Sequence, residues 1–163
     1  MTPELIVNQH IATITLRRPR QSNRLQPEDL AVIAQHIQSV NAKEEVLVLR
    51  LQSSGKYFCS GYDINQIGAP GQGDARGDVR GDAGRGFEAL VNALEDARPV
   101  TIALIQGGVY GGATDLALAC DFRLGVPGVD MFMPAARLGL HFTSTACSAT
   151  SHAWGWTPPS ACF

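Results

Sequence analysis

The sequence predicts a single domain of the α/β class, and three observations lead to that prediction. The chain has 163 residues, which is enough for one ordinary domain. About 45% of its residues are apolar and 17% are charged, so a packed core is expected rather than disorder. Segments rich in β-branched residues alternate along the chain with segments of helical apolar spacing, as the strands and helices of an α/β fold do.

The first half of the chain predicts a hairpin, a helix and a strand. Leu5–Val7 and Ile11–Leu16 alternate around His10, as the two strands of a hairpin do. Pro27–Val40 repeats apolar residues at helical spacing, and its Pro-Glu-Asp start suits a first helical turn. Val46–Leu51 reads VLVLRL, an apolar run typical of a strand that is buried on both faces.

The second half continues the alternation. We expect a helix over Phe87–Ala97, a buried strand over Val100–Ile105, a helix over Gly111–Ala119 directly after a glycine cluster, and a short strand over Asp121–Leu124. Before them, Gly68–Gly86 reads GAPGQGDARGDVRGDAGRG. So little apolar area cannot offset the entropy of ordering the chain, which predicts a mobile surface loop.

Charge, hydropathy and cysteine spacing exclude several classes of protein. The net charge of -2 gives no general field for nucleic acid or for an anionic membrane surface. No run of about 18 apolar residues is present, and the N-terminal residues lack the layout of a signal peptide, so we expect a cytoplasmic protein. The four cysteines have no CxxC spacing, which argues against a zinc site and a disulfide framework; no metal or redox cofactor is expected.

Two glycine-bearing turns are the strongest candidates for a functional site. Lys56–Ile64 and Gly107–Ala113 each follow a predicted strand, and ligand crevices of open α/β sheets form at the carboxyl ends of strands. Gly111 and Gly112 open a helix, where N–H groups point outward with the positive end of the dipole. Two such turns side by side could offer two N–H donors to one oxygen atom, which is an oxyanion hole. Taken singly, each motif is better explained as a tight packing turn.

Five segments in order give the chain a family resemblance. From about Leu5 to Phe142 it resembles the enoyl-CoA hydratase/isomerase, or crotonase, family. The matching segments are Ile14–Pro19 (ITLRRP), Val46–Ile64 with its ending FCSGYDI, Arg98–Ala103 (RPVTIA), Gly107–Asp121 (GGVYGGATDLALACD) and Met133–Leu140 (MPAARLGL). The resemblance implies the N-terminal core of a crotonase-like spiral of ββα units, the fold that is shared with Clp protease.

The resemblance also implies a substrate and roles for single residues. The substrate would be an acyl-CoA thioester, with coenzyme A present only as part of it. The backbone N–H groups of Tyr62 and Gly112 would hold the thioester oxygen while enolate charge develops, and Asp115 falls where hydratases have their first catalytic glutamate. Residues of both turns would line the CoA thioester, namely Cys59, Ser60, Gly61, Tyr62, Asp63, Ile64, Gly111 and Gly112.

Two departures from the family pattern leave the reaction open between hydration and isomerisation. Asp115 is shorter than glutamate by one methylene, and Ala135 stands where hydratases have a second catalytic glutamate. Two carboxylates usually share the proton transfers of hydration. Asp115 could instead be a first-turn carboxylate that complements the helix dipole. The alternative to an enzyme is a non-catalytic protein that at most binds acyl-CoA or a partner subunit.

Residues 143–163 differ from the rest of the chain. All 28 charged side chains precede Leu138, whereas 143–163 contain both tryptophans and no apolar period. We interpret 1–142 as a crotonase-like core and 143–163 as an aberrant tail, produced by a reading-frame shift directly after the Phe142 codon. Family members usually form homo-oligomers through C-terminal elements that have no counterpart here, so low stability and weak turnover are expected.

Overall fold

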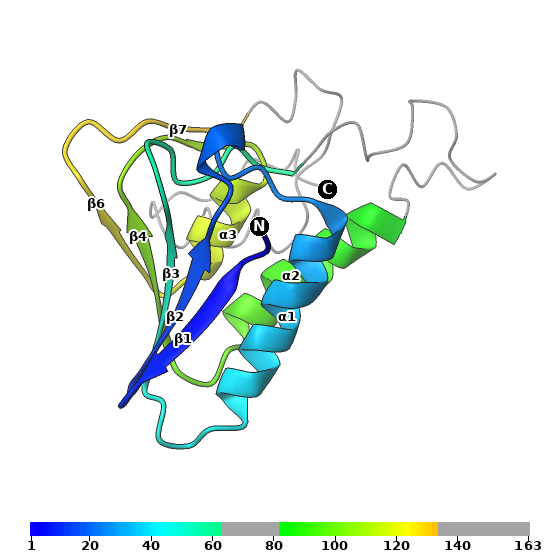
Figure 1. The fold of residues 1–163 in the computed structure, drawn as a ribbon, viewed down its shortest axis with the longest axis vertical. Coiled ribbons are helices and arrows are strands. Elements are labelled where there is room, and N and C mark those ends of the chain that lie inside the picture. The colour runs from blue at the N-terminus through cyan, green and yellow to red at the C-terminus, as the bar shows by residue number, and fades with distance from the viewer. Residues whose placement is uncertain (63–81, 134–163) are drawn as a thin grey trace, which may run out of the picture.

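A five-stranded sheet is the framework of residues 1–62 and 82–133, the part of the chain that the computed structural model describes (Figure 1). Its strands lie in the order β1-β2-β3-β4-β6. The predicted hairpin is present as an antiparallel pair, whereas the other three pairs are parallel. The strands are β1 (Glu4–Asn8), β2 (Ile11–Leu16), β3 (Val48–Ser53), β4 (Val100–Ile105) and β6 (Phe122–Gly125).

Three helices connect the parallel strands. α1 (Pro27–Asn41) joins β2 to β3, α2 (Asp82–Glu95) precedes β4, and α3 (Ala113–Ala119) lies between β4 and β6 in sequence. Figure 1 shows α1 and α2 side by side on one side of the sheet, and α2 also packs on α3. The apolar core fills the space between these helices and the sheet, which requires one face of each strand to be buried.

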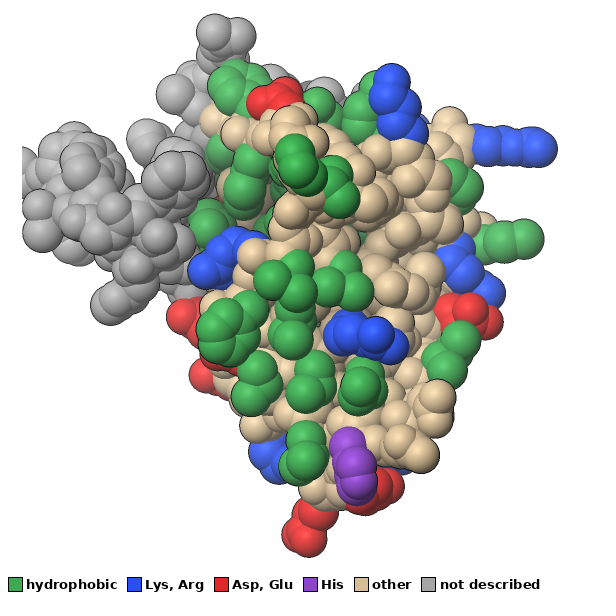
Figure 2. Space-filling model, turned by 90° about the vertical axis from the view of Figure 1, so that its left-hand side faces the viewer, with side chains coloured by type: hydrophobic (Ala, Val, Ile, Leu, Met, Phe, Trp, Pro, Cys, Tyr) green, Lys and Arg blue, Asp and Glu red, His purple; other side chains and the backbone are tan. Residues whose placement is uncertain are grey.

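The opposite face of the sheet corrects one prediction. Val46–Leu51 was expected to be buried on both faces, but β3 buries only alternate residues, Leu49 and Leu51. Arg50 points to the other face, where its guanidinium donates to Thr13 Oγ1 at 2.9 and 3.1 Å. The cause is that the described helices cover a single face. Figure 2 shows hydrophobic side chains gathered on the face turned away from them, and the large exposed apolar residues of the sheet are Ile6, Ile11, Val100, Phe122 and Leu124.

The helix bounds also differ from prediction. α1 extends one residue past the predicted end at Val40, and α3 begins at Ala113 rather than Gly111. α2 begins at Asp82 instead of Phe87, so the last five residues of the predicted Gly68–Gly86 loop are helical. Glycine disfavours helix, but packing of α2 on α1 and α3 outweighs that propensity. The remainder of the predicted loop up to residue 81, and the whole of 134–163, lie outside the described residues.

Three short elements were not predicted from the sequence. They are a 3-10 helix, η1 (Pro19–Gln21), and the two-residue strands β5 (Val109–Tyr110) and β7 (Met131–Phe132), which pair in parallel. In Figure 1, η1 and β7 lie at the end of the sheet where β3 and β4 finish, and the two glycine turns follow those strands. No helix within the described ranges is long and apolar enough to cross a bilayer.

Candidate active site

The first glycine bend, Phe58–Tyr62, follows β3 and bends sharply at Gly61. Gly61 has φ of +90°, a conformation that residues with a Cβ rarely adopt. A Cβ on Gly61 would lie 2.7 Å from the carbonyl oxygen of Tyr110 and 3.1 Å from the backbone nitrogen of Gly112. The Gly61 carbonyl accepts a hydrogen bond from the Leu25 N–H at 2.9 Å. Only glycine therefore fits between the two bends at this point.

The second bend, Gly107–Gly112, follows β4 and lies directly against the first. Cys59 and Val109 form a parallel bridge, and the Tyr110 N–H donates to the Cys59 carbonyl at 2.9 Å. A Cβ on Gly107 would collide with the Lys56 carbonyl, so the approach is close along the length of both bends. The structure thus brings Gly61, Tyr62, Gly111 and Gly112 together at one end of the sheet.

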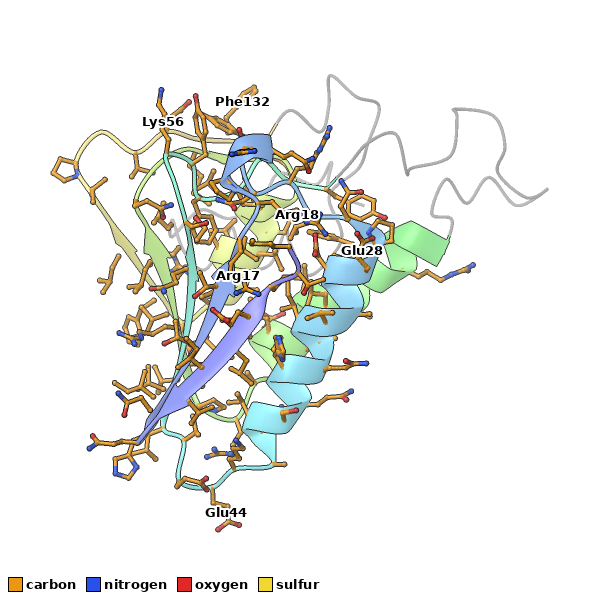
Figure 3. The ribbon with its side chains drawn as sticks, in the orientation of Figure 1. Arg17, Arg18, Glu28, Glu44, Lys56 and Phe132 are labelled. Atoms are coloured by element: carbon orange, nitrogen blue, oxygen red, sulfur yellow. The ribbon has the colours of Figure 1, made fainter. Side chains whose placement is uncertain are left out.

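The N-terminus of α3 presents the second candidate donor. Gly111 has φ of +57° and its N–H donates to the carbonyl of Phe132 on β7 at 3.0 Å. Gly112 is the N-cap of α3, and no acceptor among the described residues receives its N–H. The first N–H groups of a helix have no partner within it. Figure 3 shows Phe132 and Lys56 at this end of the molecule, with Glu44 at the opposite end.

Asp115 lies in the first turn of α3 and is almost fully buried. Asp115 is only 8% exposed, and its Oδ1 atom has no hydrogen-bond partner among the described residues. Burial raises the pKa of this carboxyl from 3.8 to about 7. A carboxylate that only complemented the helix dipole would be expected to stay ionised in contact with water. The observed environment instead favours a protonatable carboxyl, and such groups are concentrated at functional sites.

An aromatic side chain that the sequence analysis did not single out lies over the second bend. Phe87 comes from the second turn of α2, and a Cβ on Gly112 would lie 2.8 Å from its Cζ atom. The rings of Phe87 and Tyr62 have their centroids 6.2 Å apart. Phe87 therefore contacts both bends on the side that α2 faces. Its position in sequence gave no signal, since the contacts arise from the packing of α2 on α3.

Of the other predicted site residues, two are described by the structure and three are not. Cys59 is fully buried, and burial raises its thiol pKa to about 12, so it carries no thiolate at neutral pH. Ser60 donates its N–H to the Ser22 carbonyl behind the bend. Asp63, Ile64 and Ala135 lie outside the described residues. Within those that are described, no group of three or more histidine, cysteine, aspartate or glutamate side chains could hold a metal ion.

A sequence profile of the enoyl-CoA hydratase/isomerase family matches residues 7–146. The chain is 30% identical over 117 residues to a peroxisomal Delta(3,5)-Delta(2,4)-dienoyl-CoA isomerase of Arabidopsis thaliana, covering 68% of this chain and 42% of that protein. It is 31% identical over 125 residues to the (E)-benzylidenesuccinyl-CoA hydratase of Thauera aromatica, covering 76% of this chain and 46% of that one. The chain thus spans about half the length of these curated relatives.

Solved structures show the same fold. An enoyl-CoA hydratase/isomerase family protein from Hyphomonas neptunium superposes with a TM-score of 0.85 at 24% identity, covering 99% of this chain and 60% of the other. An enoyl-CoA hydratase/isomerase from Marinobacter aquaeolei gives a TM-score of 0.79 at 23% identity, covering 93% and 58%. The predicted α/β class and crotonase-like fold are confirmed, matching the N-terminal 60% or so of such structures.

Proposed function

Because this chain belongs to the enoyl-CoA hydratase/isomerase family, we propose that it binds an acyl-CoA thioester and stabilises the thioester enolate through the backbone N–H groups of Tyr62 and Gly112. One observation carries the proposal: the positions of Gly61 and Gly112, whose backbones approach so closely that a Cβ on Gly61 would lie 3.1 Å from the Gly112 nitrogen. Tyr62 follows Gly61 directly, so its amide belongs to the same bend.

Backbone N–H donors of this kind stabilise the negative charge that develops on the thioester oxygen during the reaction. When a proton leaves a carbon next to a thioester, negative charge moves to the carbonyl oxygen. Backbone N–H groups fixed by tight turns are already oriented toward that oxygen and do not have to reorganise as the charge grows. Loss of one donor in such a site typically costs about 3 kcal/mol of transition-state stabilisation.

Asp115 is the proposed proton carrier. It lies in the α3 turn that follows Gly112, and burial brings its pKa to about 7, so protonated and ionised forms are both populated at neutral pH. In an isomerisation, one carboxylate takes a proton from C2 of a 3-enoyl thioester and returns it to C4, and the double bond moves into conjugation. Hydration passes through the same enolate but needs both a water activated for attack at C3 and a proton delivered to C2, and Ala135 has no proton to give.

Two spectrophotometric assays test this proposal. Hydration of crotonyl-CoA removes the absorbance of the conjugated thioester, and isomerisation of a 3-enoyl-CoA creates it. The Asp115→Asn variant should lower turnover in whichever assay is active by about 10²- to 10⁴-fold. The Asp96→Asn variant is the matched control, because Asp96 is exposed directly after the C-terminal end of α2. Turnover that survives Asp115→Asn would remove Asp115 from the mechanism.

The second candidate function is acyl-CoA binding without catalysis. The alanine at position 135, where hydratases have a second catalytic glutamate, favours it. Calorimetric titration with butyryl-CoA, whose saturated chain can neither be hydrated nor isomerised, measures binding alone. Saturable binding of this thioester together with no turnover of crotonyl-CoA or of a 3-enoyl-CoA would establish the binding protein over the enzyme.

A further inference from the structure

A short loop, Ser22–Leu25, lies directly behind the first glycine bend and is bonded to it along its length. The Ser60 N–H donates to the Ser22 carbonyl at 2.9 Å, and the Leu25 N–H donates to the Gly61 carbonyl at 2.9 Å. Leu25 and Tyr62 form a parallel bridge. Whatever fixes this loop therefore also fixes the direction of the bend that contains the Tyr62 amide.

Asn23 fixes the loop. It is 1% exposed and has φ of +53°, a conformation that asparagine tolerates better than most residues. Its side-chain amide donates to the carbonyls of Ser54 at 2.7 Å and Tyr57 at 2.9 Å, and its Oδ1 accepts the Arg18 N–H at 2.9 Å. Both donors and the acceptor are thus used, which leaves the amide a single orientation.

The backbone of Asn23 continues the connection into the bend. The Cys59 thiol donates to the Asn23 carbonyl at 3.0 Å, and its sulfur accepts the Gly61 N–H at 3.4 Å. Burial keeps this thiol protonated, so the donor is present at every ordinary pH. Asn23 therefore reaches Gly61 through one intervening side chain, and Gly61 lies against the Gly112 nitrogen.

We propose that Asn23 is a positioning residue of the oxyanion hole: its amide joins the loop before α1 to the segment after β3, and its carbonyl holds Cys59, so that the Tyr62 amide is aimed at the same oxygen as the Gly112 amide. This inference rests on the proposed function. Asn23 does not touch substrate, and it acts only through Cys59 and Gly61.

Three variants separate this role from general stability. Asn23→Asp keeps the shape and the Oδ1 acceptor but replaces both donors with an oxygen that faces two carbonyls. Asn23→Gly keeps the positive φ and removes the whole side chain. Asn41→Gly is the matched control, because the Asn41 amide oxygen accepts the Arg98 N–H at 2.9 Å near the starts of β3 and β4, at the opposite end of the sheet.

The readout is the carbonyl stretch of bound butyryl-CoA that carries ¹³C at its thioester carbon, measured by isotope-edited infrared spectroscopy at saturating protein. Polarisation by two donors lowers this frequency relative to the free thioester. The wild-type chain and Asn41→Gly should show the full downshift, and both Asn23 variants should lose most of it while still binding the ligand. Where turnover is measurable, kcat should fall by about 10²-fold with little change in KM, as for a displaced catalytic geometry.

The possible outcomes test the oxyanion hole and the role of Asn23 separately. A wild-type chain without a downshift would overturn the oxyanion hole, and the role of Asn23 with it. A full downshift in wild type that persists in a folded Asn23→Asp or Asn23→Gly variant would overturn the role of Asn23 alone. Equal losses in the Asn23 variants and in Asn41→Gly would show a stability effect and would also overturn it. If both Asn23 variants fail to fold, Cys59→Ala carries the same expectation, since it breaks the link between Asn23 and Gly61.

Discussion

Asp115 makes the stability of the folded chain depend on pH, and replacing it with asparagine should remove that dependence. In the unfolded chain this carboxyl titrates near its ordinary value of 3.8, whereas burial raises its pKa to about 7 in the folded state. The folded state therefore holds its proton over a pH range in which the unfolded state has already released it. Its stability is then lost as the pH rises through that range.

The sign and size follow from proton linkage. Below the unfolded pKa both states are protonated and Asp115 has no effect on the pH dependence. Between 3.8 and about 7 each pH unit favours the unfolded chain by about 1.4 kcal/mol, and above the folded pKa the loss levels off. The full loss is on the order of 4 kcal/mol, of which roughly 2 to 3 kcal/mol should fall between about pH 5 and about pH 8.

Urea unfolding at these two pH values measures the effect, with circular dichroism as the signal. The free energy of unfolding of Asp115→Asn minus that of wild type should increase by roughly 2 to 3 kcal/mol from the lower pH to the higher one. Asp96→Asn is measured alongside as the control, because Asp96 is an exposed aspartate. If the Asp115→Asn difference were the same at both pH values, or shrank at the higher pH, the carboxyl would not be buried and unpaired as described.

Three further predictions concern the two bends and Asp115. Gly61→Ala should destabilise the chain by at least about 1 kcal/mol more than Gly128→Ala in urea unfolding. Both glycines have positive φ, but of the two only Gly61 would place a Cβ against a backbone oxygen, at 2.7 Å. Equal losses of stability would contradict the close approach of the two bends. Gly112→Ala should cost less stability in a Phe87→Ala background than alone, because the added methyl group would meet the Phe87 ring. A double-mutant cycle should give a coupling free energy of about 0.5–3 kcal/mol. Additive losses of stability would contradict the ring contact. If Asp115 is the base of an isomerisation, kcat/KM should rise with pH through about 7 in wild type, and a rate independent of pH in this range would exclude that role.

The sequence predicted the framework because the framework depends on local patterns. β2 and β4 have the bounds that their β-branched runs indicated, and α1 begins at Pro27, where proline and two acidic residues favour a first turn. α2 was predicted too short, because Gly84 and Gly86 disfavour helix and nothing local reveals the packing that overrides them. Strands of two residues, such as β5, are too short to have a period at all.

The candidate site likewise contains some features that depend on local sequence and others that depend on contacts between distant segments. The two bends were predicted from local sequence, because a glycine that must adopt a positive φ leaves a visible mark where it occurs. The groups that orient the bends leave no such mark. Asn23 is an ordinary polar residue in a polar stretch, yet its partners Ser54 and Tyr57 are 31 and 34 positions away. Phe87 is an ordinary helical aromatic until α2 packs on α3. Bends that depend on the backbone conformation of their own glycines can therefore be inferred from sequence, whereas residues that hold other segments in place become visible only when distant segments are brought together.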